Sequence, residues 1–106
     1  MKITEVAKVV PGPNPHQVDA RKIYDTAHAI AVVITLQPGE SLKKHMTPVD
    51  VFFYILEGNG EVLVGEETQT VEKDTVIDSP KGIPHLLRNT GEGVFRFLVV
   101  KLPKTA

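Results

Sequence analysis

The chain has 106 residues, with 12 Lys and Arg against 13 Asp and Glu, and it contains no cysteine. This length is typical of one domain, and a hydrophobic content of 42 % is enough for one core without covalent staples. The lack of cysteine excludes disulfides, thiol redox chemistry and thiolate zinc sites. Because the charge is balanced and no apolar run suits a membrane span or a signal peptide, we expect a cytoplasmic protein with neither a nucleic-acid nor a membrane partner.

The first 16 residues are expected to form a lead-in before a barrel over residues 17–106. Pro11, Pro13 and Pro15 fall within five residues, and proline removes the backbone N–H that helices and interior strands need. We predict a stiff proline-rich loop there, preceded by an extended N-terminal arm from Ile3 to Val10.

Short apolar or alternating runs follow the lead-in at regular intervals, and turns rich in glycine and proline separate them. Runs of this length and spacing, rich in β-branched residues, are typical of an all-β sandwich or barrel. No segment keeps a helical period, although alanines favour a single helical turn within Tyr24–Ile30. The predicted strands are Lys22–Tyr24, Ala29–Leu36, Val51–Leu56, Glu61–Val64, Thr68–Val71, Thr75–Ile77, His85–Arg88 and Val94–Leu102.

Two features indicate how these strands pair and pack. Glu61–Val64 and Thr68–Val71 flank a three-residue segment and therefore predict a tight hairpin. Val51–Leu56 and Phe95–Val100 are apolar on both faces, and such strands need a cover on each side. The barrel interior would be one cover. The other would be a second copy of the chain, in a homodimer packed through the outer face of Val51–Leu56, or the N-terminal arm of the same chain.

His45 and His85 are the first candidates for chemistry. Each lies at the edge of a predicted strand and follows a proline turn, so the two side chains could meet across a barrel. Imidazole is a common ligand for divalent transition metals. The alternative is a structural role, with each histidine exposed or hydrogen-bonded in the core.

The spacing around His45 resembles the first motif of the cupin superfamily. That motif reads Gly, five residues, His-x-His, three or four residues, Glu, six residues, Gly. In this chain Gly39 precedes His45 by five intervening residues and Gly58 closes the motif, whereas Thr47 and Val51 stand at the second His and the Glu positions.

The spacing before His85 resembles the second cupin motif, which reads Gly, five residues, Pro-x-Gly, two residues, His, three residues, Asn. Pro80, Gly82, His85 and Asn89 are all in register, and Asp74 stands at the position of the first glycine. The resemblance implies an all-β double-stranded β-helix, which is a small jelly-roll barrel, with the extended N-terminal arm added to it.

The resemblance also implies a metal site, since metal-binding cupins use three histidines and one glutamate from these motifs. Only His45 and His85 are retained, so the implied cofactor is a weakly held divalent metal such as Mn, Fe, Ni or Zn. Asp50, beside the Glu position, and His28, which shares the parity of the apolar residues of its strand, are alternative third ligands. His16, in the lead-in, is expected to be exposed.

A barrel of this size can bind one small molecule at its mouth. With a metal, such a protein would be an isomerase or a dioxygenase. The alternatives are a metal-free binding or sensory module, for a sugar or an organic acid, and a dimeric structural cupin with a vestigial site. From the family positions and strand alternation, the predicted pocket residues are His45, Thr47, Val51, Phe53, His85 and Leu87.

Overall fold

A computed structural model describes residues 1–103 of the chain. Within these residues the chain forms eight β-strands, and the only helix is one short 3-10 helix, η1. Most strands begin and end within two residues of the predicted runs, because alternation of apolar residues and glycine or proline turns defines them locally. The elements are η1 (Val6–Lys8), β1 (Asp19–Asp25), β2 (Ile30–Leu36), β3 (Asp50–Glu57), β4 (Asn59–Val64), β5 (Glu67–Glu72), β6 (Val76–Ser79), β7 (His85–Arg88) and β8 (Phe95–Leu102).

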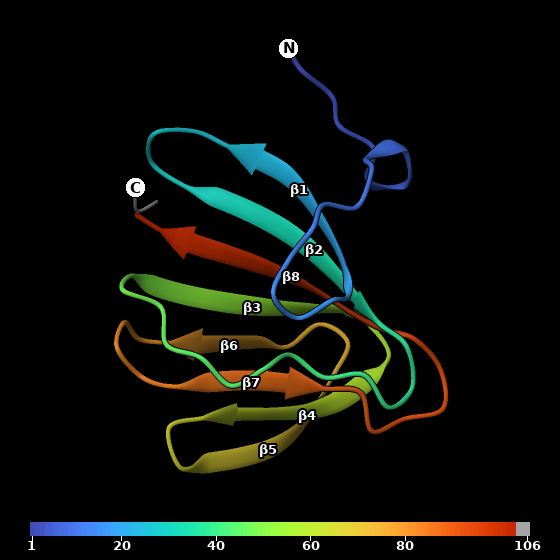
Figure 1. The fold of residues 1–106 in the computed structure, drawn as a ribbon, viewed down its shortest axis with the longest axis vertical. Coiled ribbons are helices and arrows are strands. Elements are labelled where there is room, and N and C mark those ends of the chain that lie inside the picture. Colours follow the sequence, from blue (N-terminus) through green and yellow to red (C-terminus); the bar gives the residue numbers. More distant parts are fainter. Residues whose placement is uncertain (104–106) are drawn as a thin grey trace.

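The strands form two antiparallel sheets (Figure 1). The larger sheet has the order β1-β2-β8-β3-β6, and the smaller has the order β5-β4-β7. The predicted hairpin is confirmed, because β4 pairs with β5 from Asn59 opposite Glu72 to Val64 opposite Glu67. The all-β architecture predicted from the sequence is therefore confirmed.

The core lies between the two sheets. Alternate residues of β3 and β8 point into it, and the rings of Phe53, Phe95 and Phe97 are almost completely buried there. Val62 of β4 and Leu87 of β7 complete it from the smaller sheet. Burying a side chain of this size stabilises the fold by about 1.5–3 kcal/mol, so these rings hold the sheets together.

Gly60 shows how closely the two sheets approach one another. A Cβ atom at this position would lie 2.5 Å from the backbone oxygen of Arg88 and 2.5 Å from a ring carbon of Phe95. Only glycine fits between the backbone of β7 and this buried ring, which explains a glycine inside a strand.

The N-terminal arm differs from the sequence prediction in one respect. Instead of an entirely extended arm from Ile3 to Val10, the chain forms the 3-10 helix η1, closed by a hydrogen bond from the Lys8 N–H to the Glu5 oxygen. The guanidinium of Arg21 on β1 donates to the backbone oxygen of Val6 over 3.1 Å. This bond ties η1 to the edge strand, and a helical turn there satisfies backbone groups that no neighbouring strand reaches.

The predicted helical turn within Tyr24–Ile30 was wrong. β1 continues to Asp25 and pairs with β2 as far as Ile30, because Thr26 and Ala29 close a tight turn between them. The Thr26 N–H donates to the Ala29 oxygen over 3.0 Å. Tertiary pairing with β2 thus overrides the weak helical preference of the alanines. In residues 1–103, no helix has the length and hydrophobicity that a membrane crossing requires.

Candidate functional site

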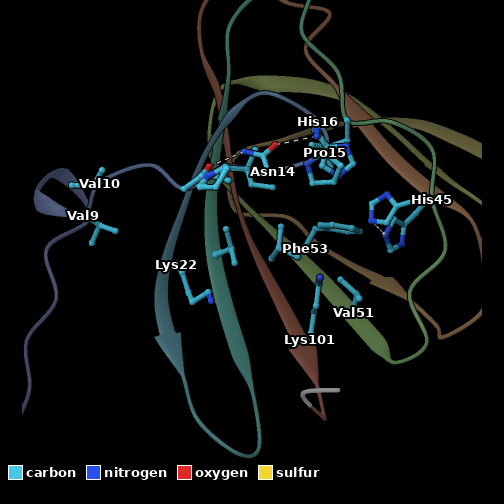
Figure 2. Close-up of a pocket in the computed structure, with 18 residues that line it drawn as sticks. Val9, Val10, Asn14, Pro15, His16, Lys22, His45, Val51, Phe53 and Lys101 are labelled. Carbon is cyan, nitrogen blue, oxygen red and sulfur yellow. Dashed lines mark hydrogen bonds between the residues drawn. The ribbon is translucent and has the colours of Figure 1, made fainter. Parts of the chain in front are cut away.

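A cavity of about 620 Å³ opens between the inner face of the larger sheet and the lead-in (Figure 2). Most of its lining is apolar, and the polar groups are concentrated in three histidines, two lysines and one asparagine. In Figure 1 the lead-in crosses β2 and β8 before it turns back into β1, and its residues form the outer wall of the cavity. The strand residues of the lining are Ala20 and Lys22 of β1, Val32 and Ile34 of β2, Val51 and Phe53 of β3, His85 of β7, and Val99 and Lys101 of β8.

The side chain of Asn14 holds the proline-rich loop in place as the outer wall. Its Nδ2 donates to the backbone oxygens of Val18 over 2.7 Å and Gly12 over 3.1 Å. Its Oδ1 accepts from the N–H groups of His16 and Val18. The Gly12 N–H also donates to the backbone oxygen of Ala20 on β1. One asparagine therefore satisfies the backbone groups that the prolines leave without strand partners.

The structure brings His45 and His85 together from the two motifs. Their backbones form an isolated antiparallel bridge, in which each N–H donates to the other residue's oxygen, over 3.2 and 2.9 Å. The two rings are perpendicular with centroids 4.6 Å apart, and their Nε2 atoms are 3.3 Å apart. The two histidines at the matching positions of the two motifs are therefore in direct contact through their imidazole rings.

Hydrogen bonds define where the protons lie when both rings are in their neutral forms. The Nδ1 of His45 lies 2.9 Å from the backbone oxygen of Lys43, which can only accept, so Nδ1 carries the proton and Nε2 accepts. The Nε2 of His85 must then donate to it, with Thr47 Oγ1 as a second acceptor at 3.3 Å. The remaining atom of the ring, Nδ1, accepts from the hydroxyl of Ser79 over 2.6 Å. Every ring nitrogen of the pair therefore has a partner.

His85 is held in its neutral form. Its side chain is 3 % exposed and packs edge-on against Phe53. Burial lowers the pKa of His85 from its ordinary value of 6.5 to about 4, and the charges of His45 in its protonated form and of Lys101 act in the same direction. An imidazole in this setting accepts a proton only in acid.

His16 was expected to be exposed, and this prediction was wrong. It is half-buried at the cavity wall, with its ring centroid 4.9 Å from that of His45. Its Nδ1 accepts from the N–H of Lys43 over 2.8 Å, so the neutral ring carries its proton on Nε2. Burial lowers the pKa of His16, and the charges of His45, Lys43 and Lys101 add to this decrease.

The other predicted site residues fall into three groups. Thr47 is buried and contacts the His85 ring, and Val51 and Phe53 line the cavity beside it. Leu87 is completely buried in the core between the sheets, outside the lining of this cavity. The remaining two, the alternative third metal ligands, lie elsewhere.

The structure brings neither alternative third ligand to the histidine pair. Asp50 is exposed, and its Oδ1 accepts from the N–H of Lys81 over 3.0 Å, on the face of β3 opposite to Val51. His28 is exposed in the turn between β1 and β2. Strand alternation directs Asp50 outward because no bulge precedes it to reset the register.

The donor set does not fit a tightly held metal ion. Within residues 1–103, no group of three His, Asp or Glu side chains is close enough to bind one ion. Two imidazole nitrogens bound to one ion at about 2.1 Å would lie about 3 Å apart, as those of His45 and His85 do. The pair could thus provide two ligands, but tightly held catalytic ions have three from the protein.

Two residues of the site were missed in the sequence. Ser79, at the end of β6, lies beyond the predicted strand Thr75–Ile77 and next to Pro80, but it is 1 % exposed and bonded to His85. Lys101 is absent from the predicted pocket residues, although it follows the alternation of the buried Phe97 and Val99 and so points to the same face of the sheet. That alternation is the signal that could have identified it.

The two sheets, the histidine pair at the open end and the cavity beside it define a small barrel protein with a binding pocket. The model of the cupin domain family matches residues 32–101, which include both motifs. The chain therefore belongs to the cupin domain family, as the resemblance predicted. A search of curated proteins found no match.

Solved structures agree with this assignment. A protein from Thermus thermophilus is 27 % identical, with a TM-score of 0.85 over 99 % of this chain and 100 % of that one. A Streptococcus pyogenes protein of unknown function is 26 % identical, with a TM-score of 0.76 over 99 % of this chain and 90 % of that one. A predicted oxalate decarboxylase from Thermotoga maritima is 18 % identical, with a TM-score of 0.88 over 97 % and 100 %, respectively, and this likeness shows the fold alone.

Proposed function

We propose that this cupin binds a small organic molecule in the cavity and that binding requires no metal. The observation that carries the proposal is the lining, which is mainly apolar with a few polar groups. Binding sites for small molecules are typically concave and apolar, with a few placed polar groups that fix the orientation of the ligand. A volume of about 620 Å³ lies within the range of such sites.

The histidine pair would form the polar end of this site. Because His85 is neutral and its nitrogens are already bonded to Ser79 and His45, it holds His45 in a fixed orientation. A pre-organised wall of this kind lowers the cost of ordering side chains when a ligand binds.

The test uses N-phenyl-1-naphthylamine, a neutral apolar dye that fluoresces in apolar sites. We expect saturable binding of one dye per chain in a buffer containing EDTA. Ala20→Phe would place a ring into the cavity from β1 and should weaken dye binding by tenfold or more. The matched control is Ala27→Phe, in the exposed turn after β1, which should bind the dye like the unaltered protein. Equal binding by both variants, or none by the unaltered protein, would overturn the proposal.

Metal binding by the histidine pair stays a prediction, and the 3.3 Å between the two Nε2 atoms is the observation that favours it. With two protein ligands we expect weak binding that competes with the proton that now lies between the rings. Equilibrium dialysis with Mn, Fe, Ni and Zn measures it directly. Stoichiometric retention of any of these ions after dialysis, lost in His45→Ala, would establish a metal site and contradict the metal-free proposal.

A further inference from the structure

The charges that line the cavity are all of one sign. Besides the histidines, the lining includes the ammonium groups of Lys22 and Lys101, and it includes no aspartate or glutamate. The net charge of the whole chain is −1, so this excess of cations is a local property of the cavity.

The two lysines differ in their surroundings. Lys22 is 57 % exposed in its side chain and lies 3.6 Å from the carboxylate of Asp25, so its charge is already compensated. Lys101 is half-buried at the end of β8, and within residues 1–103 no carboxylate lies within ion-pair distance of it. In Figure 2 its side chain extends from the strand toward Phe53, beside Val51.

An ammonium group without a counter-ion is costly to place against an apolar wall. The charge of Lys101 is felt at the cavity wall, since it contributes, after burial and the charge of His45, to lowering the pKa of both His85 and His16. Two side-chain acceptors of the lining are already engaged, since the Nε2 of His45 accepts from His85 and the Oδ1 of Asn14 accepts from the N–H groups of His16 and Val18. An anion inside the cavity would remove this cost.

We infer that the ligand of this cavity is an organic monoanion, whose carboxylate pairs with Lys101 and whose apolar body packs against Val32, Ile34 and Val99. The inference rests on the proposed function and adds the chemical class of the ligand. A single uncompensated cation balances a single negative charge, which favours a monocarboxylate over a dianion. Charge-assisted hydrogen bonds of this type are about twice as strong as neutral ones.

His16 adds a second N–H donor to the cavity wall. Because its Nδ1 accepts from Lys43, the proton of the neutral ring is on Nε2, and the ring is part of the cavity wall. The lead-in thus contributes a polar group as well as apolar surface to the site. Asn14, through Val18, and Gly12, through Ala20 on β1, hold the proline-rich loop in the position that brings His16 to the wall.

The test compares two ligands of the same shape, phenylacetate and phenylacetamide, as competitors of the neutral dye at pH 7 in EDTA. We expect phenylacetate to displace the dye at a concentration at least tenfold lower than phenylacetamide does. Lys101→Met removes the charge but keeps an apolar side chain of similar length, and it should abolish this preference. Lys73→Met, in the exposed turn after β5, is the matched control and should retain the preference.

The outcomes separate this inference from the proposed function. If the dye binds but the two competitors are equally effective, or if neither displaces the dye, the monoanion inference is overturned and the cavity remains a binding site. A preference for phenylacetate that survives in Lys101→Met also overturns it. If the dye itself does not bind to the unaltered protein, the proposed function fails.

Discussion

The buried His85 makes the stability of this protein sensitive to acid, and the sign of the effect follows from its titration. In the unfolded chain its pKa has the ordinary value of 6.5, whereas in the folded protein it is about 4. Between these values the unfolded chain takes up a proton that the folded protein does not. Stability rises with pH wherever the unfolded state binds more protons, so this contribution is complete above pH 6.5 and is lost as the pH falls toward 4.

The size of this effect follows from the difference between the two pKa values. One pKa unit corresponds to about 1.4 kcal/mol, so a pKa that moves from 6.5 to about 4 contributes about 3 kcal/mol. We therefore expect the free energy of unfolding to decrease by about 3 kcal/mol between pH 7 and pH 4 through this residue alone. The half-buried His16, whose pKa is also lowered, acts in the same direction.

The perturbation that isolates this contribution is His85→Asn, which removes the titration and keeps an acceptor for the Ser79 hydroxyl. Urea denaturation at several pH values between 7 and 4 gives the free energy of unfolding of each protein. The variant should lose about 3 kcal/mol less over this range than the unaltered protein. His28→Asn, in the exposed turn after β1, serves as the control and should follow the unaltered protein. Equal pH dependence in His85→Asn and in the unaltered protein would show that His85 does not cause the loss of stability in acid.

Three further predictions concern packing. Ser79→Ala leaves a buried imidazole nitrogen without its donor and should lower the free energy of unfolding, measured in urea, by about 1–3 kcal/mol. The control Thr70→Ala, on the exposed face of β5, should change it by no more than about 0.5 kcal/mol. Equal effects of the two substitutions would contradict a stabilising Ser79–His85 hydrogen bond. Gly60→Ala should lower the free energy of unfolding by about 2 kcal/mol or more, since its Cβ would lie 2.5 Å from a carbonyl oxygen of β7. The control is Gly12→Ala, whose Cβ would meet nothing within 4 Å. A Gly60→Ala variant as stable as the unaltered protein would contradict the close approach of the two sheets. Phe52→Lys, on the half-buried outer face of β3, should convert the predicted homodimer to a monomer in sedimentation velocity, and a monomeric unaltered protein would disprove that interface.

The strands could be predicted from the sequence because the signals for them are local. β7 has the predicted bounds, His85–Arg88, and β2 and β8 differ from the predicted runs by one residue at one end. β1 is longer than predicted, since polar residues such as Asp19 carry no strand signal and pairing with β2 extends it. Local alternation predicts the strand, but the partner strand sets its ends.

The contact between His45 and His85 could be predicted, because the resemblance to two spaced motifs carries long-range information. The position of His16 could not, since it depends on how the side chain of Asn14 shapes the loop and on a long-range hydrogen bond from the Lys43 N–H to the His16 ring. No periodic pattern in a proline-rich loop encodes such a contact. Lys101 could have been predicted from the sequence, because strand alternation from Val99 directs its side chain toward the cavity.

The proposal that the cavity takes an organic monoanion without a metal can be tested by methyl-detected NMR, with phenylacetate added to the protein in EDTA. The prediction is a saturable change in the methyl signals of Ile34 and Val99, which line the cavity, while those of Val76, exposed on β6, stay unchanged. Changes that appear only after a divalent metal replaces the EDTA, or that occur at Val76 and not at Ile34 and Val99, would contradict the account.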